Sequence, residues 1–330
     1  MKETLLCCRI TAQEKGLYRL CHDGVEQAAQ VSGKFQYEAL GPSDYPTVGD
    51  EVLADLNGGG QAVIHKVLPR KSLFLRKAAG TAREEQPVAA NVDILFLCMA
   101  LNNDFNLRRL ERYLAAAWNS GATPVVVLTK ADLCGDPSEK VAAVEEAAPG
   151  TDVLLTSAAQ EDGIRPLLPY LTSGRTVAFV GSSGVGKSTL MNGLLGKEIL
   201  ATGGLRNDDR GRHTTTRRQM FFLPGGAALI DTPGMRELGL WDSESGLETA
   251  FADIEALARQ CRFQDCRHEK EPGCAVRAAQ ASGELSEERF RSWQRLSAEN
   301  RYADDRAAHM SAKEWKFRMI AQFNKSNSKR

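Results

Sequence analysis

The chain lacks a long apolar run, an excess of charge of one sign and an internal repeat. Its longest apolar stretch, residues 94–101, is far shorter than the roughly 20 residues of a membrane-spanning helix, so we expect no membrane segment. Its first residues include Glu3 and no long apolar stretch follows them, so no secretory signal is expected. Because 42 Lys and Arg residues balance 42 Asp and Glu residues, a uniformly basic surface is excluded, and any contact with nucleic acid must use local patches.

Cysteine occurs eight times, without the secretory signal that accompanies disulfide-rich proteins. We therefore expect a cytoplasmic location and cysteines that bind metal rather than form disulfides. The length of 330 residues, at roughly 100–200 residues per domain, predicts two or three domains.

The N-terminal part, residues 1–72, has the pattern of short strands joined by turns rich in Gly, Pro and Asp. About five strands in this length favour a small β-barrel, for which an OB-fold is one candidate. Residues 73–90 are polar and contain Pro87, so we expect a linker there. The strands expected from the pattern include residues 5–10, 34–39, 51–56 and 62–67.

Residues 91–240 alternate continuous apolar strands with amphipathic helices, which predicts a mostly parallel sheet covered on both faces. Residues 241–330 have a helical pattern, interrupted at 261–274 by a Cys/His cluster, and end in a basic tail from Lys313. The expected fold class is multidomain α/β, with a barrel, a central nucleotide-binding domain and a C-terminal helical domain.

A phosphate-binding motif occupies residues 181–189, which carry the pattern G-x-x-x-x-G-K-[ST] between an apolar strand and a helical segment. The glycines there let backbone N–H groups converge on phosphate oxygens at the start of a helix. Lys187 would reach the β- and γ-phosphates, and the Ser188 hydroxyl would contact Mg²⁺. The candidate phosphate-binding residues are Gly181, Ser182, Ser183, Gly184, Val185, Gly186, Lys187, Ser188 and Thr189.

A second phosphate motif, Asp231-Thr232-Pro233-Gly234, follows the apolar run 227–230. The Asp231 carboxylate at the end of that strand can hold the shell of Mg²⁺, and the Gly234 N–H can meet a γ-phosphate. The pattern alone is common in turns, and its position after a phosphate loop gives it weight.

Two further motifs fit recognition of guanine. Asp132, in Thr129-Lys130-Ala131-Asp132, can accept from N1–H and the 2-amino group of guanine. Adenine offers neither donor, so this carboxylate would favour GTP over ATP by on the order of a hundredfold. Thr156-Ser157-Ala158 fits the short loop of GTPases that contacts the base. The candidate base-binding residues are Thr129, Lys130, Asp132, Ser157 and Ala158.

The order of these motifs is unusual. Ordinary GTPases run from phosphate loop to switch motifs to base motifs, but here the base motifs precede residues 181–189. This order predicts a circularly permuted GTPase domain, since permutation is tolerated where chain termini lie close together at the surface. The segment after Gly234 then leads directly into the C-terminal region, which could transmit the nucleotide state along the chain.

The C-terminal cluster has the spacing C-x4-C-x-H-x5-C, formed by Cys261, Cys266, His268 and Cys274. Three thiolates and one imidazole are a closed tetrahedral set, so we expect one structural Zn²⁺ ion without a catalytic position. Cys266 and His268 would point the same way on an extended chain.

Taken together, these features resemble the RsgA (YjeQ) family of small ribosomal subunit biogenesis GTPases over nearly the whole chain. The most specific pieces are residues 181–189 in permuted order, 211–216 (Gly-Arg-His-Thr-Thr-Thr), 231–234 and the Cys/His cluster. The resemblance implies an N-terminal OB-fold, GTP hydrolysis stimulated by the 30S subunit, and a role in late 30S maturation. The chain departs from the family at Thr129, where Asn is usual, and a hydroxyl lacks the reach of an amide toward the base.

Hydrolysis by the protein alone should be slow. Met235 stands where Ras-like enzymes carry the glutamine that orients the attacking water, and a thioether cannot do this. His213 is the candidate catalytic residue, which would position water once a partner orders its loop; a surface histidine without a role is the alternative. Thr215 and Thr216 are the candidates for contact with Mg²⁺ in the GTP state.

Local basic clusters are candidates for contact with 16S rRNA. They are Arg206, Arg210, Arg212, Arg217 and Arg218 beside the threonine run, Arg259, Arg262, Arg267 and Lys270 around the metal cluster, and the tail 313–330. The leading hypothesis is a monomeric, cytoplasmic GTPase that binds GTP, GDP and the 30S subunit and uses hydrolysis to time its release. The alternatives are an RNA-binding scaffold that holds guanine nucleotide with little turnover, and an adenine-nucleotide enzyme, against which Asp132 argues.

Overall fold

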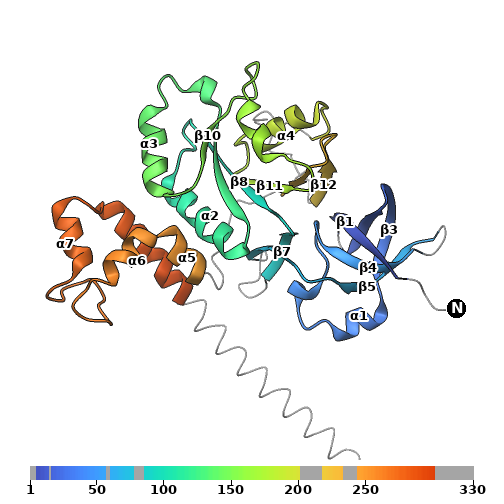
Figure 1. Ribbon diagram of the computed structural model, residues 1–330, viewed down its shortest axis with the longest axis horizontal. Coiled ribbons are helices and arrows are strands. Elements are labelled where there is room, and N and C mark those ends of the chain that lie inside the picture. The colour runs from blue at the N-terminus through green and yellow to red at the C-terminus, as the bar shows by residue number, and fades with distance from the viewer. Residues whose placement is uncertain are drawn as a thin grey trace, which may run out of the picture. The chain divides into compact units, whose positions relative to one another are not determined.

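The computed structural model describes residues 5–14, 16–56, 60–77, 85–200, 218–232 and 244–301. The chain divides into two compact units, residues 1–239 and residues 240–330 (Figure 1). In the described ranges, no helix has both the length and the apolar character needed to span a membrane.

A small barrel forms the N-terminal part of the first unit and is blue in Figure 1. Its strands pair in the order β1-β2-β3-β5-β4, and β4 also pairs with β1, which closes the ring. Ile10, Leu20 and Ile64 point inward and are fully buried. The predicted small barrel is confirmed. The strands are β1 (Leu6–Glu14), β2 (Leu17–His22), β3 (Val25–Val31), β4 (Glu51–Asp55) and β5 (Ala62–Val67).

The stretch 34–39, predicted as a strand, is a helix instead. Helix α1 (Gly33–Glu38) begins after Ser32, whose Oγ accepts a hydrogen bond from the Phe35 N–H at 3.1 Å. The alternation of apolar and polar residues does not mark a buried face here, since Tyr37 is 90% exposed. A short helical turn, η1 (Pro42–Asp44), follows.

The segment 73–90, predicted as a linker, contains two paired strands. β6 (Leu73–Lys77) and β7 (Glu85–Ala90) are antiparallel, and Phe74 and Val88 are buried. The overall polarity of the segment concealed these short apolar runs. Pro87 lies in β7 where the pairing register shifts, a position that tolerates a residue without an N–H.

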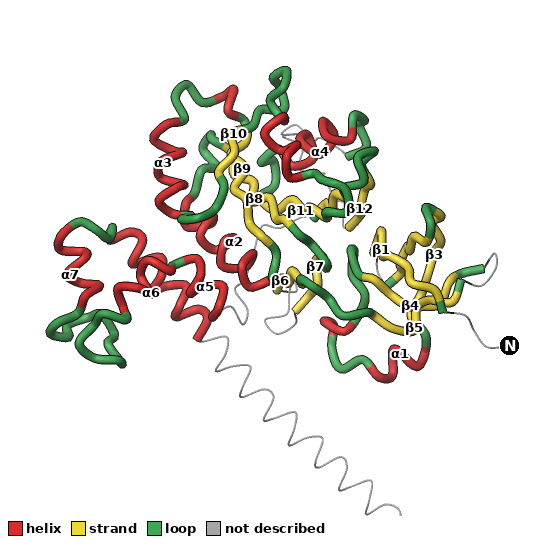
Figure 2. The backbone as a smooth tube through the Cα atoms, in the orientation of Figure 1, coloured by secondary structure: helices red, strands yellow, loops and turns green. Residues whose placement is uncertain are grey.

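The central part of the first unit is a sheet in the order β10-β9-β8-β11-β13-β12. Neighbouring strands are parallel except β12 and β13, so the predicted mostly parallel sheet is confirmed. Figure 2 shows α2 and α3 on one side of these strands and α4 on the other. The strands are β8 (Ile94–Ala100), β9 (Thr123–Thr129), β10 (Val153–Leu155), β11 (Thr176–Gly181), β12 (Arg218–Phe222) and β13 (Ala228–Asp231). The helices are α2 (Leu107–Ser120), α3 (Ser138–Ala147) and α4 (Lys187–Leu195), with short turns η2 (Ala131–Leu133) and η3 (Arg165–Tyr170).

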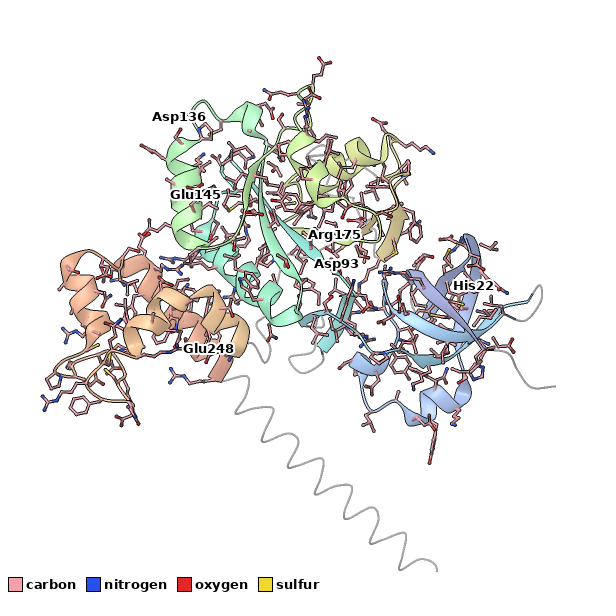
Figure 3. The ribbon with its side chains drawn as sticks, viewed as in Figure 1. His22, Asp93, Asp136, Glu145, Arg175 and Glu248 are labelled. Atoms are coloured by element: carbon pink, nitrogen blue, oxygen red, sulfur yellow. The ribbon has the colours of Figure 1, made fainter. Side chains whose placement is uncertain are left out.

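The sheet core explains the apolar runs of the sequence. β8 lies between β9 and β11 and is buried along its whole length, with Phe96 packed edge-on against Phe179 at a centroid distance of 5.2 Å. Asp93 and Arg175 precede β8 and β11, and Figure 3 shows them beside each other at one end of the sheet. Because the two strands are parallel, their carboxyl ends meet at the opposite end, where the phosphate motif begins.

The barrel joins the sheet along β12. The register pairs Gln13 of β1 with Arg218, and the Arg218 guanidinium donates to Gln13 Oε1 at 3.2 Å. Nearby, the Asn91 side chain donates to the Gly49 carbonyl at 3.0 Å. A Cβ on Gly49 would lie 2.1 Å from the Ala90 carbonyl oxygen, so only glycine permits this close approach.

The second unit is helical. Its elements are α5 (Glu244–Ala250), α6 (Ala252–Ala258), α7 (Ala275–Ser282) and a helix over 287–301. The buried Arg289 guanidinium donates to both Asp253 carboxylate oxygens, at 2.6 and 2.7 Å, and lies 4.8 Å from the Phe251 ring centroid. This pairing fixes the helix over 287–301 against α6.

Candidate nucleotide-binding site and metal centre

The predicted phosphate loop connects β11 to α4, the setting that the motif requires. Gly184 and Gly186 have φ values of +76° and +106°, which glycine adopts without strain. A Cβ on Gly181 would lie 2.5 Å from the Cys98 carbonyl oxygen, so the loop passes too close to β8 for any side chain there. Lys187 is the first residue of α4, and Ser188 and Thr189 follow in its first turn.

Lys187 is held inside the loop. Its Nζ donates to the carbonyl oxygens of Gly181 and Ser182, each at 2.7 Å, and the side chain is buried. Burial lowers the pKa of the Lys187 ammonium, and nearby acidic groups, including Asp231, oppose that shift. Burial likewise raises the pKa of Asp231, and the Lys187 charge opposes it. A phosphate group and a divalent cation are the partners that would stabilise these two charged forms in a dry site.

The base motif at 129–132 contacts the phosphate loop directly. Thr129 ends β9, and its hydroxyl donates to the Val185 carbonyl oxygen at 2.5 Å. Lys130 has a left-handed backbone, and its Nζ donates to the Gly184 carbonyl oxygen at 2.8 Å. Two residues of the base motif therefore hold two consecutive carbonyl groups of the phosphate loop, although more than 50 positions separate them in sequence.

The second base loop supports the first. Ser157 is buried, and its hydroxyl donates to the Asp132 carboxylate at 2.5 Å. The Ala131 N–H donates to the Thr156 carbonyl at 3.1 Å, and the Ser157 N–H donates to the Gly163 carbonyl at 3.0 Å. Ala158 follows and is exposed. The Asp132 carboxylate is exposed, so it remains open to a base on its outer side.

Two residues at this site were missed by the sequence analysis. The Ser182 hydroxyl donates to the Asp104 carboxylate, which also pairs with Arg109 at 2.9 Å. Asp104 lies just after the carboxyl end of β8, beside the phosphate loop, and a carboxylate following a buried strand was a usable signal. Gly163 closes the loop that carries Ser157, and nothing in the sequence pattern marked it.

Several predicted residues lie outside the described part of the chain. They are His213, Thr215, Thr216, Gly234 and Met235, together with Arg206, Arg210, Arg212, Arg217 and the tail 313–330. Asp231 is the last residue of β13, next to β11, which leads into the phosphate loop.

The four predicted metal ligands come together in the second unit. Their donor atoms lie within 4.8 Å of one another. The His268 Nδ1 is 3.6 Å from the Cys261 Sγ and 3.4 Å from the Cys274 Sγ, and the two sulfurs are 3.9 Å apart. Ligand atoms at the corners of a tetrahedron with 2.3 Å Zn–S bonds are separated by about 3.8 Å, so the residues fit one metal ion such as zinc. Cys266 supplies the fourth donor atom of the cluster.

The backbone at this cluster differs from the extended chain that was predicted. His268 has a φ of +60°, and its ring is buried against Trp293 at a centroid distance of 5.6 Å. The Trp293 Nε1 donates to Glu255 at 3.1 Å, and the Phe290 ring stacks on Trp293. The Glu271 carboxylate accepts hydrogen bonds from the N–H groups of Arg267, Glu269 and Lys270. Backbone groups and aromatic packing thus arrange the ligands.

Comparison with protein families gives two matches. The model of the RsgA GTPase family matches residues 67–241, more than half of the chain, and this span contains both base motifs and the phosphate loop. The model of the ABC transporter family matches residues 166–328, which include the phosphate loop but neither base motif.

Individual relatives agree with the first match. The chain is 51% identical over 295 residues to the small ribosomal subunit biogenesis GTPase RsgA 2 of Lactiplantibacillus plantarum, covering 89% of this chain and 83% of that protein. It is 45% identical to the RsgA of Methanosarcina acetivorans, covering 93% and 82%. The crystal structure of YjeQ from Thermotoga maritima is similar with a TM-score of 0.66 and 28% identity, covering 89% and 97%. YloQ, a circularly permuted GTPase, shares the fold with a TM-score of 0.62 and 23% identity, covering 92% and 96%.

Proposed function

Because the chain belongs to the RsgA family of circularly permuted GTPases, we propose that it binds the small (30S) ribosomal subunit and assists its late maturation. It hydrolyses GTP to GDP and phosphate, and hydrolysis times its release from the subunit. The observation that best supports this proposal is the pair of hydrogen bonds from Thr129 and Lys130 to the phosphate loop, since a guanine motif and a phosphate motif must lie together to bind one nucleotide.

Each motif has a part in nucleotide binding. Backbone N–H groups of residues 181–189 surround the phosphates, and Lys187 leaves its carbonyl partners to meet the β- and γ-phosphates. Asp132, oriented by Ser157, accepts from N1–H and the 2-amino group of guanine, and the Ala158 N–H faces the base. Gly234 meets the γ-phosphate. Ser188 and Asp231 hold Mg²⁺, joined in the GTP state by Thr215 or Thr216.

The basic residues beside the metal centre support contact with RNA. Arg259, Arg262, Arg267 and Lys270 are all exposed on the second unit. The Arg262 guanidinium lies 5.6 Å from the centroid of the Phe263 ring, which is 41% exposed and offers a surface for stacking. One structural Zn²⁺ ion, bound by Cys261, Cys266, His268 and Cys274, stabilises the fold of this region. The basic side chains of the surface then contact the phosphates of 16S rRNA.

We further propose functional domains at residues 1–72, 91–240 and 241–330, connected through 73–90. The barrel, the sheet and the helical unit follow this order along the chain. We also propose that the protein is cytoplasmic and monomeric; a reducing compartment fits the cysteines, which form no disulfide in the described residues.

A scaffold that holds guanine nucleotide with little turnover is the second candidate, favoured by Met235 at the position of the usual glutamine. Multiple-turnover phosphate release, measured with and without purified 30S subunits, separates the two. A GTPase that times release gains turnover on adding 30S, whereas a scaffold stays near zero in both conditions. Binding to 30S should weaken steeply with rising salt, because RNA phosphates supply the contacts, and a flat response would contradict the RNA surface.

A further inference from the structure

Thr129 departs from the family's usual asparagine, and its hydroxyl has a partner inside the protein. The Thr129 Oγ1 lies 2.5 Å from the Val185 carbonyl oxygen, and the side chain is 2% exposed. A carbonyl oxygen can only accept a hydrogen bond, so the hydroxyl must be the donor. A threonine hydroxyl has a single hydrogen, and that hydrogen is therefore committed to the phosphate loop.

In the proposed site Asp132 takes the donors of guanine, N1–H and the 2-amino group, which leaves the acceptors N7 and O6 for any other side chain. N7 and O6 both require a donor from the protein. An asparagine amide has two N–H hydrogens and could serve the phosphate loop and the base at once, whereas threonine has none to spare. The neighbouring Lys130 ammonium is also engaged with the loop, at the Gly184 carbonyl.

We propose that Thr129 is a positioning residue, which fixes the phosphate loop through Val185 and makes no hydrogen bond to guanine. Recognition of the base then rests on Asp132 and on the loop that carries Ser157. This inference rests on the proposed guanine nucleotide site and concerns which of its residues read the base. The backbone at Thr129 is held in place, which suits a positioning role. Its carbonyl oxygen accepts a hydrogen bond from the Leu101 N–H at 3.0 Å, and the strand β9 is buried.

A hydrogen bond from Thr129 to N7 and a purely positioning role predict different responses to a base without N7. The probe is 7-deaza-GDP, which has a C–H in place of the N7 acceptor and keeps the phosphates of GDP. Affinities for the full chain with Mg²⁺ are measured by displacement of a fluorescent GDP. Thr129→Val keeps the shape of the side chain and removes the hydroxyl, and Thr129→Ser restores the hydroxyl.

We expect Thr129→Val to weaken GDP and 7-deaza-GDP by the same factor, about tenfold, because a carbonyl of the loop loses its donor. Thr129→Ser should return both affinities to within about twofold of the natural chain. Thr176→Val is the matched control, since it removes another buried threonine hydroxyl of the sheet, one that accepts from Arg9 and not from the phosphate loop. It should leave both affinities unchanged even if it lowers the unfolding temperature.

A Thr129→Val variant that loses affinity for GDP alone, and binds 7-deaza-GDP as the natural chain does, would overturn the proposal. Failure of the proposed function looks different. In that case the natural chain binds ADP as tightly as GDP, or binds neither, before any variant is made.

Discussion

The Ser157 hydroxyl donates to the Asp132 carboxylate at 2.5 Å, across 25 positions of sequence. One oxygen of the Asp132 carboxylate therefore already accepts a hydrogen bond within the protein. Asp132 is otherwise exposed, so the carboxylate can still accept hydrogen bonds from a base. Neighbouring loops from the ends of β9 and β10 thus orient one carboxylate, which we propose reads the base.

Asp132→Asn should change which base is preferred. The amide offers a donor that suits the 2-oxo group of xanthine, while the carboxylate suits the two donors of guanine. We expect affinity for GDP to fall by about tenfold or more and affinity for xanthosine diphosphate to rise. Asp136→Asn is the control, because this exposed carboxylate accepts from the Ser138 N–H at the start of α3. Unchanged base preference in Asp132→Asn would remove that residue from the base site.

Gly163→Ala should weaken guanine binding, although Gly163 is not itself proposed to contact the nucleotide. An added Cβ would lie 1.8 Å from the Ser157 carbonyl oxygen, so the loop that orients Asp132 must shift. We expect affinity for GDP to fall by about tenfold and stability by roughly 1–3 kcal/mol. Gly135→Ala is the matched control, because a Cβ there meets nothing within 4 Å. Equal GDP affinities in the two variants would contradict a positioning role for Gly163.

Removing the metal should unfold the region around the cluster and leave nucleotide binding intact. Structural zinc supplies folding free energy to segments with small cores. Since His268 packs on Trp293, chelation should change tryptophan emission, and Trp293→Phe should reduce that change. GDP affinity, measured on the same sample, should stay constant because the described nucleotide residues belong to the first unit. If tryptophan emission changes neither with the chelator nor with added zinc, that result would argue against a metal at this cluster.

Alkaline pH should destabilise the barrel through Tyr18. Burial raises the pKa of Tyr18 to about 12, with its hydrogen bond to Gln13 opposing the shift. A tyrosine in the unfolded chain ionises near pH 10, so the stability that Tyr18 contributes is complete below pH 10 and is lost as pH rises through about 12. Tyr18→Phe should escape this loss, which reaches about 2–3 kcal/mol in urea unfolding. Tyr37→Phe, at a 90% exposed ring, should follow the natural chain.

His213→Ala should reduce turnover only in the presence of 30S subunits. His213 precedes the threonine run, and its proposed task of positioning water needs a partner to order that segment. Stimulated phosphate release should fall by about a hundredfold or more, within the range for loss of general acid–base catalysis, while GDP affinity stays the same. Stimulated turnover equal to that of the natural chain would leave His213 without a catalytic role.

Local sequence predicted the strand–loop–helix setting of residues 181–189 and the Cys/His cluster, because each is contained in a few consecutive residues. The loop 181–189 needs glycines, a lysine and a following helix, and all are contiguous. The Cys/His ligands also lie within one short segment, and the structure brings their donor atoms together. Helix α1 was missed because its start depends on one side-chain cap at Ser32, which a strand-like alternation outweighed.

Contacts between residues far apart in the chain could not be predicted from the sequence pattern. Asp104 meets Ser182 only because the sheet sets β8 beside β11, and no spacing rule links the two residues. Gly49 is required by the Ala90 carbonyl, which comes from another part of the chain. The strands in 73–90 likewise gain stability from pairing with each other and from packing, which average polarity does not report.

The pairing of β1 with β12 has a consequence for how the protein can be divided. β13 covers one edge of β12, and the barrel covers part of the other. A shortened protein that begins after the barrel would present the uncovered N–H and C=O groups of β12 to other molecules, and exposed strand edges of this kind promote aggregation. The barrel therefore also protects the GTPase sheet, and a soluble truncation will need a charged or proline substitution along β12.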